Sequence, residues 1–182
     1  MIRREYGLEK DKYILFLGRR VPEKGLTYLI DAFKNVDTDF KLVIAGGSSD
    51  TDTYTDQIKN MAKDDLRILF TGFVQGKMLE ELYSNAYVYV LPSDVEGMPL
   101  SLLEAMSYGN CCLVSDIKEI TEVVEDKAVI FPKGNVNLLT KKLQFLCDNK
   151  SEVAQYKAQA TEFICGKYNW NSVVNETVSL YY

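Results

Sequence analysis

Short apolar runs that alternate with longer segments of helical period leave few folds open to this chain. Six such runs are predicted to be β-strands, at residues 13–17, 40–45, 66–70, 86–91, 111–115 and 128–131. Between the first two runs, the apolar side chains fall on one helical stripe: Leu26, Leu29, Ile30, Phe33 and Val36. Strands that alternate with helices indicate βαβ units, in which neighbouring strands run parallel.

Other helices are predicted near residues 53–62, 77–85, 99–109, 119–125 and 135–147. After a loop at 148–151 the strand signals stop, and two closing helices, at 151–164 and 170–181, are expected to pack back on the sheet. The pattern predicts an α/β fold, a Rossmann-like three-layer α/β/α domain with a mostly parallel sheet that spans residues 13–182. Residues 1–12 are charged and show no core-forming period, so we expect them to be the remnant of an interdomain linker.

The charge balance argues against a nucleic-acid partner. The chain has 21 Lys and Arg against 26 Asp and Glu, a net charge of −5, whereas neutralising a phosphate backbone needs a basic face. The longest apolar run, at residues 86–91, is far shorter than the ~20 residues that cross a bilayer. The first residues contain no apolar stretch typical of a secretory signal, so we expect a cytoplasmic protein.

The cysteines and histidines offer no zinc site of the usual spacing, because histidine is absent and no Cys-x-x-Cys pair occurs. We expect reduced and mostly buried thiols at Cys111, Cys112, Cys147 and Cys165. Six aromatic side chains are expected to pack in the core: Tyr83, Tyr87, Tyr89, Trp170, Tyr181 and Tyr182.

The segments that follow the predicted strands are rich in glycine and polar residues. In a parallel sheet every strand ends at the same edge, where open α/β sheets bind ligands. After the first four strands come Gly18-Arg19-Arg20-Val21-Pro22-Glu23-Lys24-Gly25, Gly46-Gly47-Ser48-Ser49-Asp50, Thr71-Gly72-Phe73-Val74-Gln75-Gly76 and Pro92-Ser93-Asp94-Val95-Glu96-Gly97-Met98-Pro99, and after the fifth comes Asp116. Glycine serves either a turn with positive φ or a ligand that approaches the backbone closely, and the five segments together favour a ligand.

Arg19 and Lys24 lie five residues apart, just before an apolar helix. Two cations and a helix N-terminus can converge on an anion such as a diphosphate. The alternative is a solvated basic loop. The segment is not a Walker A loop, because no Gly-x4-Gly-Lys-Ser/Thr occurs, and Gly-x-Gly-x-x-Gly is also absent from it.

Two glutamates at a spacing of eight form the second candidate site. Pro99 suits the first turn of a helix, so Glu96 is expected in the loop before that helix and Glu104 inside it. A carboxylate among Leu102, Leu103, Ala105 and Met106 is costly to bury without a partner. A vicinal diol such as that of ribose could satisfy Glu104, and a nearby lysine or a backbone group is the alternative. Glu96 could hold sugar hydroxyls, and the N–H groups from Gly97 to Leu100 could face an anion.

The order of these motifs resembles the C-terminal, donor-binding half of GT-B-fold glycosyltransferases of the GT4 (group 1) family. The likeness rests on Gly18-Arg19-Arg20-x-x-Glu23-Lys24-Gly25, on Pro92-Ser93-x-x-Glu96-Gly97, and on the run from Glu96 to Glu104-Ala105-Met106-x-x-Gly109. It extends from Tyr6-Gly7-Leu8 to Tyr168-Asn169-Trp170. Two loops depart from the family pattern: Gly46-Gly47-Ser48-Ser49-Asp50 lacks the usual Gly-x-Gly ending, and Ser115-Asp116-Ile117-Lys118-Glu119 stands where many relatives have Gly-Gly.

The resemblance implies a role for each matching residue. Arg19 and Lys24 would bind the diphosphate of a nucleotide-sugar, such as a UDP- or GDP-hexose, and stabilise the charge of the leaving group. Glu96 would contact the donor sugar and Glu104 the ribose hydroxyls, and the backbone near Val74 would help to hold the base. The remaining donor-binding residues would be Gly18, Gly97, Met98, Pro99 and Leu100. The family retains the anomeric configuration and uses no bound metal or other cofactor.

The resemblance also implies a missing partner. A GT-B enzyme needs an N-terminal Rossmann-like domain for the acceptor, and this chain has no room for one, so it is expected to bind the donor without turning it over. The full protein would add a hexosyl unit to a glycan or a lipid-linked acceptor, in the cytoplasm or at the inner face of the cell membrane.

Three other interpretations remain open from the sequence. Asp37-Thr38-Asp39 and Asp50-Thr51-Asp52 match the DxD pattern with which GT-A transferases hold a divalent cation, although polar turns beside a strand have the same composition. A nucleotide-sugar epimerase half would share the fold and need its own acid and base. A nucleotide-sugar-binding or regulatory module would leave the chemistry to a partner.

Overall fold

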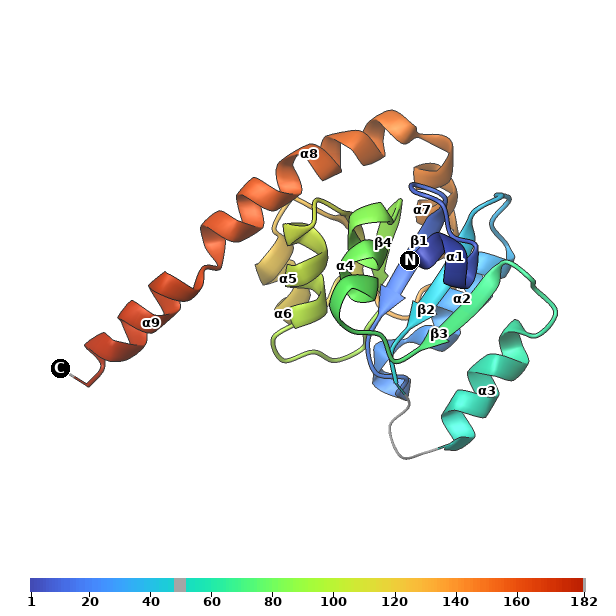
Figure 1. The fold of residues 1–182 in the computed structure, drawn as a ribbon, viewed down its shortest axis with the longest axis horizontal. Helices are drawn as coiled ribbons and strands as arrows, with labels where there is room; N and C mark the ends of the chain where they lie inside the picture. Colours follow the sequence, from blue (N-terminus) through green and yellow to red (C-terminus); the bar gives the residue numbers. More distant parts are fainter. Residues whose placement is uncertain (48–51, 182) are drawn as a thin grey trace.

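The computed structural model describes residues 1–47 and 52–181 and contains, within them, a six-stranded parallel sheet (Figure 1). The strands are β1 (Tyr13–Leu17), β2 (Lys41–Ala45), β3 (Ile68–Gly72), β4 (Val88–Leu91), β5 (Cys111–Ser115) and β6 (Val129–Phe131), in the spatial order β3-β2-β1-β4-β5-β6. The predicted fold class, a Rossmann-like α/β domain with a parallel sheet, is therefore confirmed.

Strand β1 lies at the centre of the sheet, between β2 and β4. Tyr13 is opposite Lys41 on one side, and Ile14 is opposite Val88 on the other. Strands β2 and β3 are added in succession on one side of β1. The chain then returns to the centre, and β4, β5 and β6 are added in succession on the other side. The loops that follow β1 and β4 therefore diverge at a topological switch point, which is where open α/β sheets place their ligand crevices.

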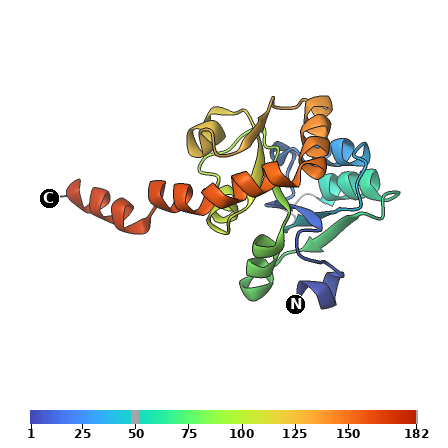
Figure 2. The same ribbon diagram turned by 90° about the horizontal axis from the view of Figure 1, so that it is seen from above.

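The helices form a layer on each face of the sheet (Figures 1 and 2). One layer contains α2 (Leu26–Lys34), which packs against α3 (Asp52–Ala62) and α7 (Val136–Asp148). The other contains α4 (Gly76–Asn85) and α5 (Leu100–Ser107), and α8 (Lys150–Lys167) packs across α5 and β5. The short α6 (Lys118–Val124) contacts β5, and a single 3-10 turn, η1 (Pro22–Lys24), precedes α2. Strands β1, β4 and β5 are buried because they are covered on both faces.

The third strand begins two residues later than predicted, at Ile68. The Asp65 carboxylate accepts hydrogen bonds from the backbone N–H and the guanidinium of Arg67, and Ile68 N donates to the Asp65 carbonyl. This turn leaves Leu66 almost fully exposed, with a relative accessibility of 97%. Leu66 was wrongly expected in the strand, because its apolar side chain extends the run without pairing in the sheet.

The first residues do contribute to the core, against the expectation that they lack a core-forming pattern. They form a short helix, α1 (Ile2–Tyr6), that packs against α4, and Ile2 and Leu8 are buried. Two apolar positions in so short a segment are too few for a periodicity to be seen. The role of residues 1–12 as an interdomain linker stays a prediction.

The two closing helices behave differently. Helix α8 packs on the domain as predicted, whereas α9 (Trp170–Ser179) extends away from it (Figures 1 and 2). Val174, Val178 and Tyr181 are exposed, so the prediction that this helix packs on the sheet is wrong, and so is the core position of Tyr181. The apolar period of a helix shows that it has an apolar face, and does not show which surface covers that face. Tyr83, Tyr87 and Tyr89 are buried as predicted, and Tyr182 lies outside the described residues.

Two glycines allow the loops at the carboxyl edge of the sheet to touch. Gly25 has φ of +67°, and a Cβ atom placed on it would lie 2.1 Å from the carbonyl oxygen of Pro92, which follows β4. Gly46 has φ of +129°, and a Cβ atom there would lie 2.0 Å from the carbonyl oxygen of Gly18. Any larger residue at either position would push apart the loops that follow β1, β2 and β4.

We therefore expect Gly25→Ala to destabilise the domain by about 2 kcal/mol or more, because it adds a left-handed backbone strain of about 1–3 kcal/mol to the collision with Pro92. Gly166→Ala is the control, since Gly166 lies in α8 with open space around it, and alanine there should leave the stability unchanged or raise it by up to about 1 kcal/mol. Urea denaturation followed by circular dichroism gives both values. Equal midpoints for Gly25→Ala and the parent chain would contradict the close approach.

Candidate functional site

The candidate site lies at the carboxyl edge of the sheet, where the loop after β1 meets the loop after β4. Asp94 N donates to the carbonyl of Glu23, at 2.8 Å, and the Tyr28 hydroxyl donates to the Asp94 carboxylate, at 3.0 Å. The hydrogen bond to Asp94 raises the pKa of Tyr28 above its ordinary value. Backbone and side chain together hold the two loops in contact at the switch point.

Lys24 and Glu96 form an ion pair across this junction. The Lys24 Nζ lies 2.6 Å from Glu96 Oε1, and the two side chains are only 16% and 6% exposed. An ion pair so far removed from water is screened little by salt. The structure therefore brings together Lys24 and Glu96, two candidate residues that lie 72 positions apart in the sequence.

Ser93 is the second partner of Glu96. Its hydroxyl donates to the same oxygen, Oε1, at 2.6 Å, and its carbonyl accepts from the Ser115 hydroxyl, also at 2.6 Å. Ser93 and Ser115 are buried, so this chain of hydrogen bonds links the Glu96 loop to the end of β5. Both bonds fall on Oε1, so within residues 1–47 and 52–181 the other oxygen of Glu96 has no side-chain partner.

The two arginines after β1 face different environments. Arg19 is exposed, and within residues 1–47 and 52–181 its side chain has no ion pair or hydrogen bond. Arg20 is buried, and its backbone N–H donates to the Gly47 carbonyl at 3.0 Å. Gly18 N donates to the Ala45 carbonyl, which keeps this loop against the end of β2. Arg19 thus differs from the buried Arg20, and from Lys24, which pairs with Glu96, because its charge is exposed to solvent.

The predicted helix entrance is confirmed in outline. Glu96 lies in the loop, Pro99 is the buried N-cap residue, and α5 begins at Leu100. The expectation of free N–H groups from Gly97 to Leu100 is wrong in part, because Pro99 has no N–H and Leu100 N donates to the Met98 carbonyl at 2.9 Å. Gly97, Met98 and Leu100 are exposed at the edge of the sheet.

Glu104 is exposed on α5, which corrects the prediction of a buried carboxylate. Its neighbours Leu102, Ala105 and Met106 point into the core, while Glu104 falls on the outer face of the same helix. One of its oxygens, Oε2, accepts a hydrogen bond of 2.9 Å from the Tyr83 hydroxyl. The partner is therefore a tyrosine from α4, and not the lysine or backbone group that was the alternative to a ligand.

Two residues of this arrangement were missed as functional candidates. The sequence shows Ser93 only as part of a motif and Tyr83 only as an expected core aromatic. A buried tyrosine hydroxyl usually finds a hydrogen-bond partner, which was the one signal available for Tyr83. Nothing in the sequence connects Tyr83 with Glu104, 21 residues later, because only the packing of α4 on α5 makes them neighbours.

The other predicted positions lie at the carboxyl edge of the sheet, at its opposite edge, or outside the described residues. Val74 follows β3, three strands from β4 in the sheet order, and is half-buried against the core. The second loop is described only as far as Gly47, and the pattern Asp50-Thr51-Asp52 lies outside the described residues except at its last position. Asp37-Thr38-Asp39 precedes β2, so it lies at the opposite edge of the sheet, where it pairs with Gln144.

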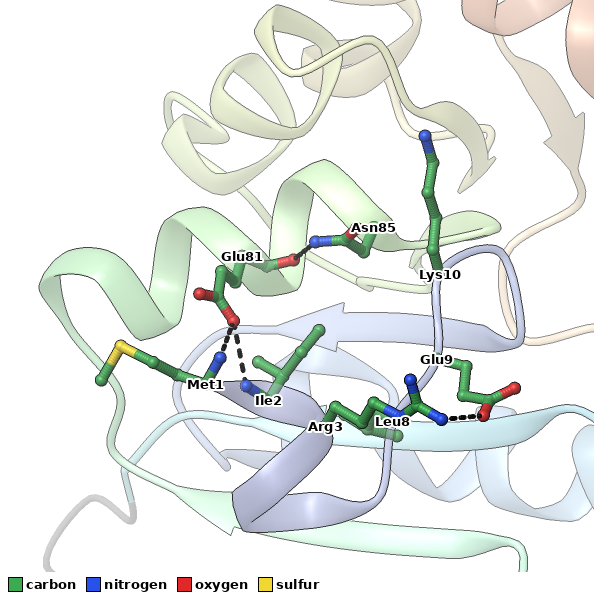
Figure 3. Close-up of a pocket in the computed structure, with 8 residues that line it drawn as sticks. All are labelled: Met1, Ile2, Arg3, Leu8, Glu9, Lys10, Glu81 and Asn85. Atoms are coloured by element: carbon green, nitrogen blue, oxygen red, sulfur yellow. Dashed lines mark hydrogen bonds and ion pairs between the residues drawn. The ribbon is translucent and has the colours of Figure 1, made fainter.

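Two cavities lie at the amino edge of the sheet, away from these residues. One, of about 600 Å³, lies between α1 and α4, and its lining residues bond to one another: Glu81 accepts from Met1 and Ile2, and Arg3 pairs with Glu9 (Figure 3). The other, of about 540 Å³, lies beside Lys157, which pairs with Asp11. The candidate site is by comparison a charged junction of two loops at the carboxyl edge.

The part of the chain that the structure describes contains neither a metal-binding cluster nor a membrane-spanning helix. No group of three or more His, Cys, Asp or Glu side chains there is placed to hold a metal ion. None of the helices in residues 1–47 and 52–181 is long and apolar enough to span a bilayer.

The fold and the site define an α/β domain whose charged residues gather at the switch point of a parallel sheet. The chain belongs to the glycosyl transferases group 1 family, whose family model matches residues 1–163. The family predicted from the sequence motifs is therefore confirmed.

Curated relatives and solved structures agree with this assignment. An uncharacterised glycosyltransferase of Methanocaldococcus jannaschii is 32% identical over 98% of this chain, and the O-antigen chain mannosyltransferase B of Escherichia coli is 28% identical over 97%. The chain spans about half the length of these relatives, 47% of each. HepE of Anabaena, solved with UDP and glucose, superposes with a TM-score of 0.89 at 18% identity, over 98% of this chain and 51% of HepE. The fold is that of GT-B glycosyltransferase domains.

Lys24 and Arg19 should contribute very differently to the stability of the unliganded domain. Lys24→Met leaves the Glu96 carboxylate poorly solvated, with Ser93 as its remaining partner. We therefore expect the free energy of unfolding to fall by roughly 2 kcal/mol, which is less than the fall of about 3–5 kcal/mol for a fully buried pair. Arg19→Met, the matched control, should change the stability by no more than about 0.5 kcal/mol because the side chain is exposed. Urea unfolding measures both, and equal losses would contradict the role of the Lys24–Glu96 pair.

Proposed function

We propose that this chain is the donor-binding half of a retaining, metal-independent glycosyltransferase. The donor is a nucleotide-sugar such as a UDP- or GDP-hexose, and its hexosyl unit passes to a glycan or a lipid-linked acceptor. The observation that carries the proposal is the Lys24–Glu96 pair at the switch point, with Arg19 beside it in the chain and Glu104 on the helix that begins there.

The two cations suit the diphosphate of the donor. An ammonium group has three N–H donors, and Lys24 uses one on Glu96, so two remain for phosphate oxygens. Arg19 is exposed in the same loop and can swing onto the diphosphate, where a guanidinium binds two oxygens at once. As the bond to the sugar breaks, negative charge grows on the departing phosphate, and both cations stabilise it. The chain thus supplies without a metal the positive charge that phosphate departure needs.

The two glutamates suit the hydroxyl groups of the donor. Glu96 has a lone-pair-bearing oxygen left beside Lys24, so a sugar bound there lies next to its own diphosphate. Glu104 lies four residues into α5, about 6 Å along the helix from Leu100, which suits the ribose on the far side of the diphosphate. Gly18, Gly97, Met98, Pro99 and Leu100 line the edge between these groups, and the backbone near Val74 holds the base.

The comparisons support a longer parent protein. The curated relatives are about twice as long as this chain, which leaves room for a second domain that binds the acceptor. On this proposal the chain alone binds the donor and does not turn it over. We place the full protein in the cytoplasm or peripherally at the inner face of the cell membrane, where lipid-linked acceptors are reached from the nucleotide-sugar pool.

A screen of nucleotides by thermal shift tests the class of ligand. We expect UDP, GDP or ADP to raise the melting temperature of this chain to the same extent in EDTA and in manganese, because the cations come from Arg19 and Lys24. Stabilisation that appears only with manganese would favour a DxD-type site and contradict the proposal. No stabilisation by any of the three nucleotides, in either buffer, would also count against it.

Removal of the Glu104 carboxylate tests the ribose assignment. We expect Glu104→Ala to weaken binding of the nucleotide found in the screen about tenfold, or ~1.4 kcal/mol, in isothermal titration calorimetry. Glu162→Ala, which removes an exposed carboxylate from α8, should leave the affinity unchanged. The pair Arg19→Ala and Lys24→Ala, combined in one variant, should weaken binding further than Glu104→Ala alone. Unchanged affinity in a folded Glu104→Ala protein would refute the assignment.

A further inference from the structure

Tyr83 is a buried residue whose hydroxyl reaches the proposed ligand-binding face of α5. The residue lies near the end of α4 and is 1% exposed. Its hydroxyl donates to Glu104 Oε2 at 2.9 Å and lies 3.3 Å from the Ser101 carbonyl. The buried Tyr83 therefore carries a hydroxyl that meets Glu104, an exposed residue of α5.

The position of the Tyr83 ring is fixed from three directions. The ring stacks on Tyr108 with centroids 5.4 Å apart and an interplanar angle of 11°, and it lies 6.2 Å from Tyr89. The buried Asn110 amide donates both to the Tyr83 carbonyl and to the Ala105 carbonyl, which ties the end of α4 to α5. The hydroxyl is thus a rigid donor at a set place beside α5.

A second tyrosine holds the same turn of α5. The Tyr89 hydroxyl donates to Ser101 Oγ at 2.8 Å and lies 3.3 Å from the Leu17 carbonyl, the last residue of β1. Burial raises the pKa of both hydroxyls well above the ordinary value for tyrosine, so Tyr83 and Tyr89 stay protonated donors at any pH the fold tolerates. The turn that presents Glu104 is therefore anchored to the sheet beneath it.

Glu104 depends on this anchor, because its other surroundings are solvent. A free glutamate side chain samples many rotamers, and a ligand that binds it must immobilise it. A donor that holds Oε2 beforehand lowers that cost and leaves Oε1 to accept from a ligand. Because Glu104 is exposed, its carboxylate needs a positioning residue to hold it in one orientation.

We propose that Tyr83 is a positioning residue for the ribose of the donor: it holds one oxygen of Glu104 so that the carboxylate meets the vicinal diol in a single orientation. This inference rests on the proposed function and assigns a role in it to a residue that contacts no ligand. Tyr83 acts through Glu104, so its contribution exists only for ligands that carry the hydroxyls Glu104 binds.

The test compares ribonucleotides with their 2′-deoxy forms. We expect Tyr83→Phe, which keeps the ring and its stacking on Tyr108, to weaken binding of UDP, GDP or ADP about fivefold in titration calorimetry. Binding of the matching 2′-deoxynucleoside diphosphate should change less than twofold, because Glu104 has then already lost part of its contact. A purely structural role would weaken both ligands equally.

Tyr87→Phe is the matched control. It also removes a buried tyrosine hydroxyl, whose 2.8 Å hydrogen bond goes to the Leu146 carbonyl at the other edge of the sheet, and it should leave both affinities unchanged. Thermal unfolding of Tyr83→Phe and Tyr87→Phe should show similar losses of stability, so that the difference in binding is not a difference in folding.

The outcomes separate this inference from the proposed function. If Glu104→Ala weakens the ribonucleotide and Tyr83→Phe does not, the positioning role is wrong and the ribose site stands. Equal weakening of ribonucleotide and deoxynucleotide by Tyr83→Phe also overturns the positioning role. If the parent chain binds none of UDP, GDP and ADP, the proposed function fails and the inference fails with it.

Discussion

The close approach of Gly25 to the Pro92 carbonyl is the contact on which the candidate site depends. It requires a residue without a side chain at a positive φ, and it brings the loop after β1 against the loop after β4. Lys24, the neighbour of Gly25, reaches Glu96 only because these loops touch. A parallel sheet makes such loops share an edge, but only the switch point between β1 and β4 makes them adjacent and divergent.

Buried hydroxyl groups support both glutamates of the site. Ser93, itself bonded by Ser115, donates to Glu96, and Tyr83 donates to Glu104. Each glutamate has one oxygen held from within the domain and one left for the outside. On the proposed function, this division lets a carboxylate that is 6% exposed and one on an open helix face each accept from a ligand hydroxyl. The protein supplies to the other oxygen a donor that water would otherwise supply.

Most of the fold could be predicted because local signals and tertiary burial agree there. The strands of the sheet centre are apolar on both faces, so their runs stand out, and the helices between them have one apolar stripe. The errors fall where an apolar residue is not buried or a buried one lacks neighbours in the pattern. Leu66 continues an apolar run into an exposed turn, and Ile2 and Leu8 pack in the core from a charged segment. Helix α9 has apolar residues, of which Val174 and Val178 are exposed.

The sequence by itself determined the order of strands and helices, the edge at which the charged loops meet, and the family, because strand periodicity and motif spacing are local properties of the chain. Only the tertiary structure decided that Lys24 pairs with Glu96, that Arg19 faces solvent while Arg20 is buried, and that Glu104 is exposed with Tyr83 as its partner. These contacts join residues from different βα units. They follow from the packing of α4 on α5 and of one loop on another, and no local pattern records which side chains meet across such an interface.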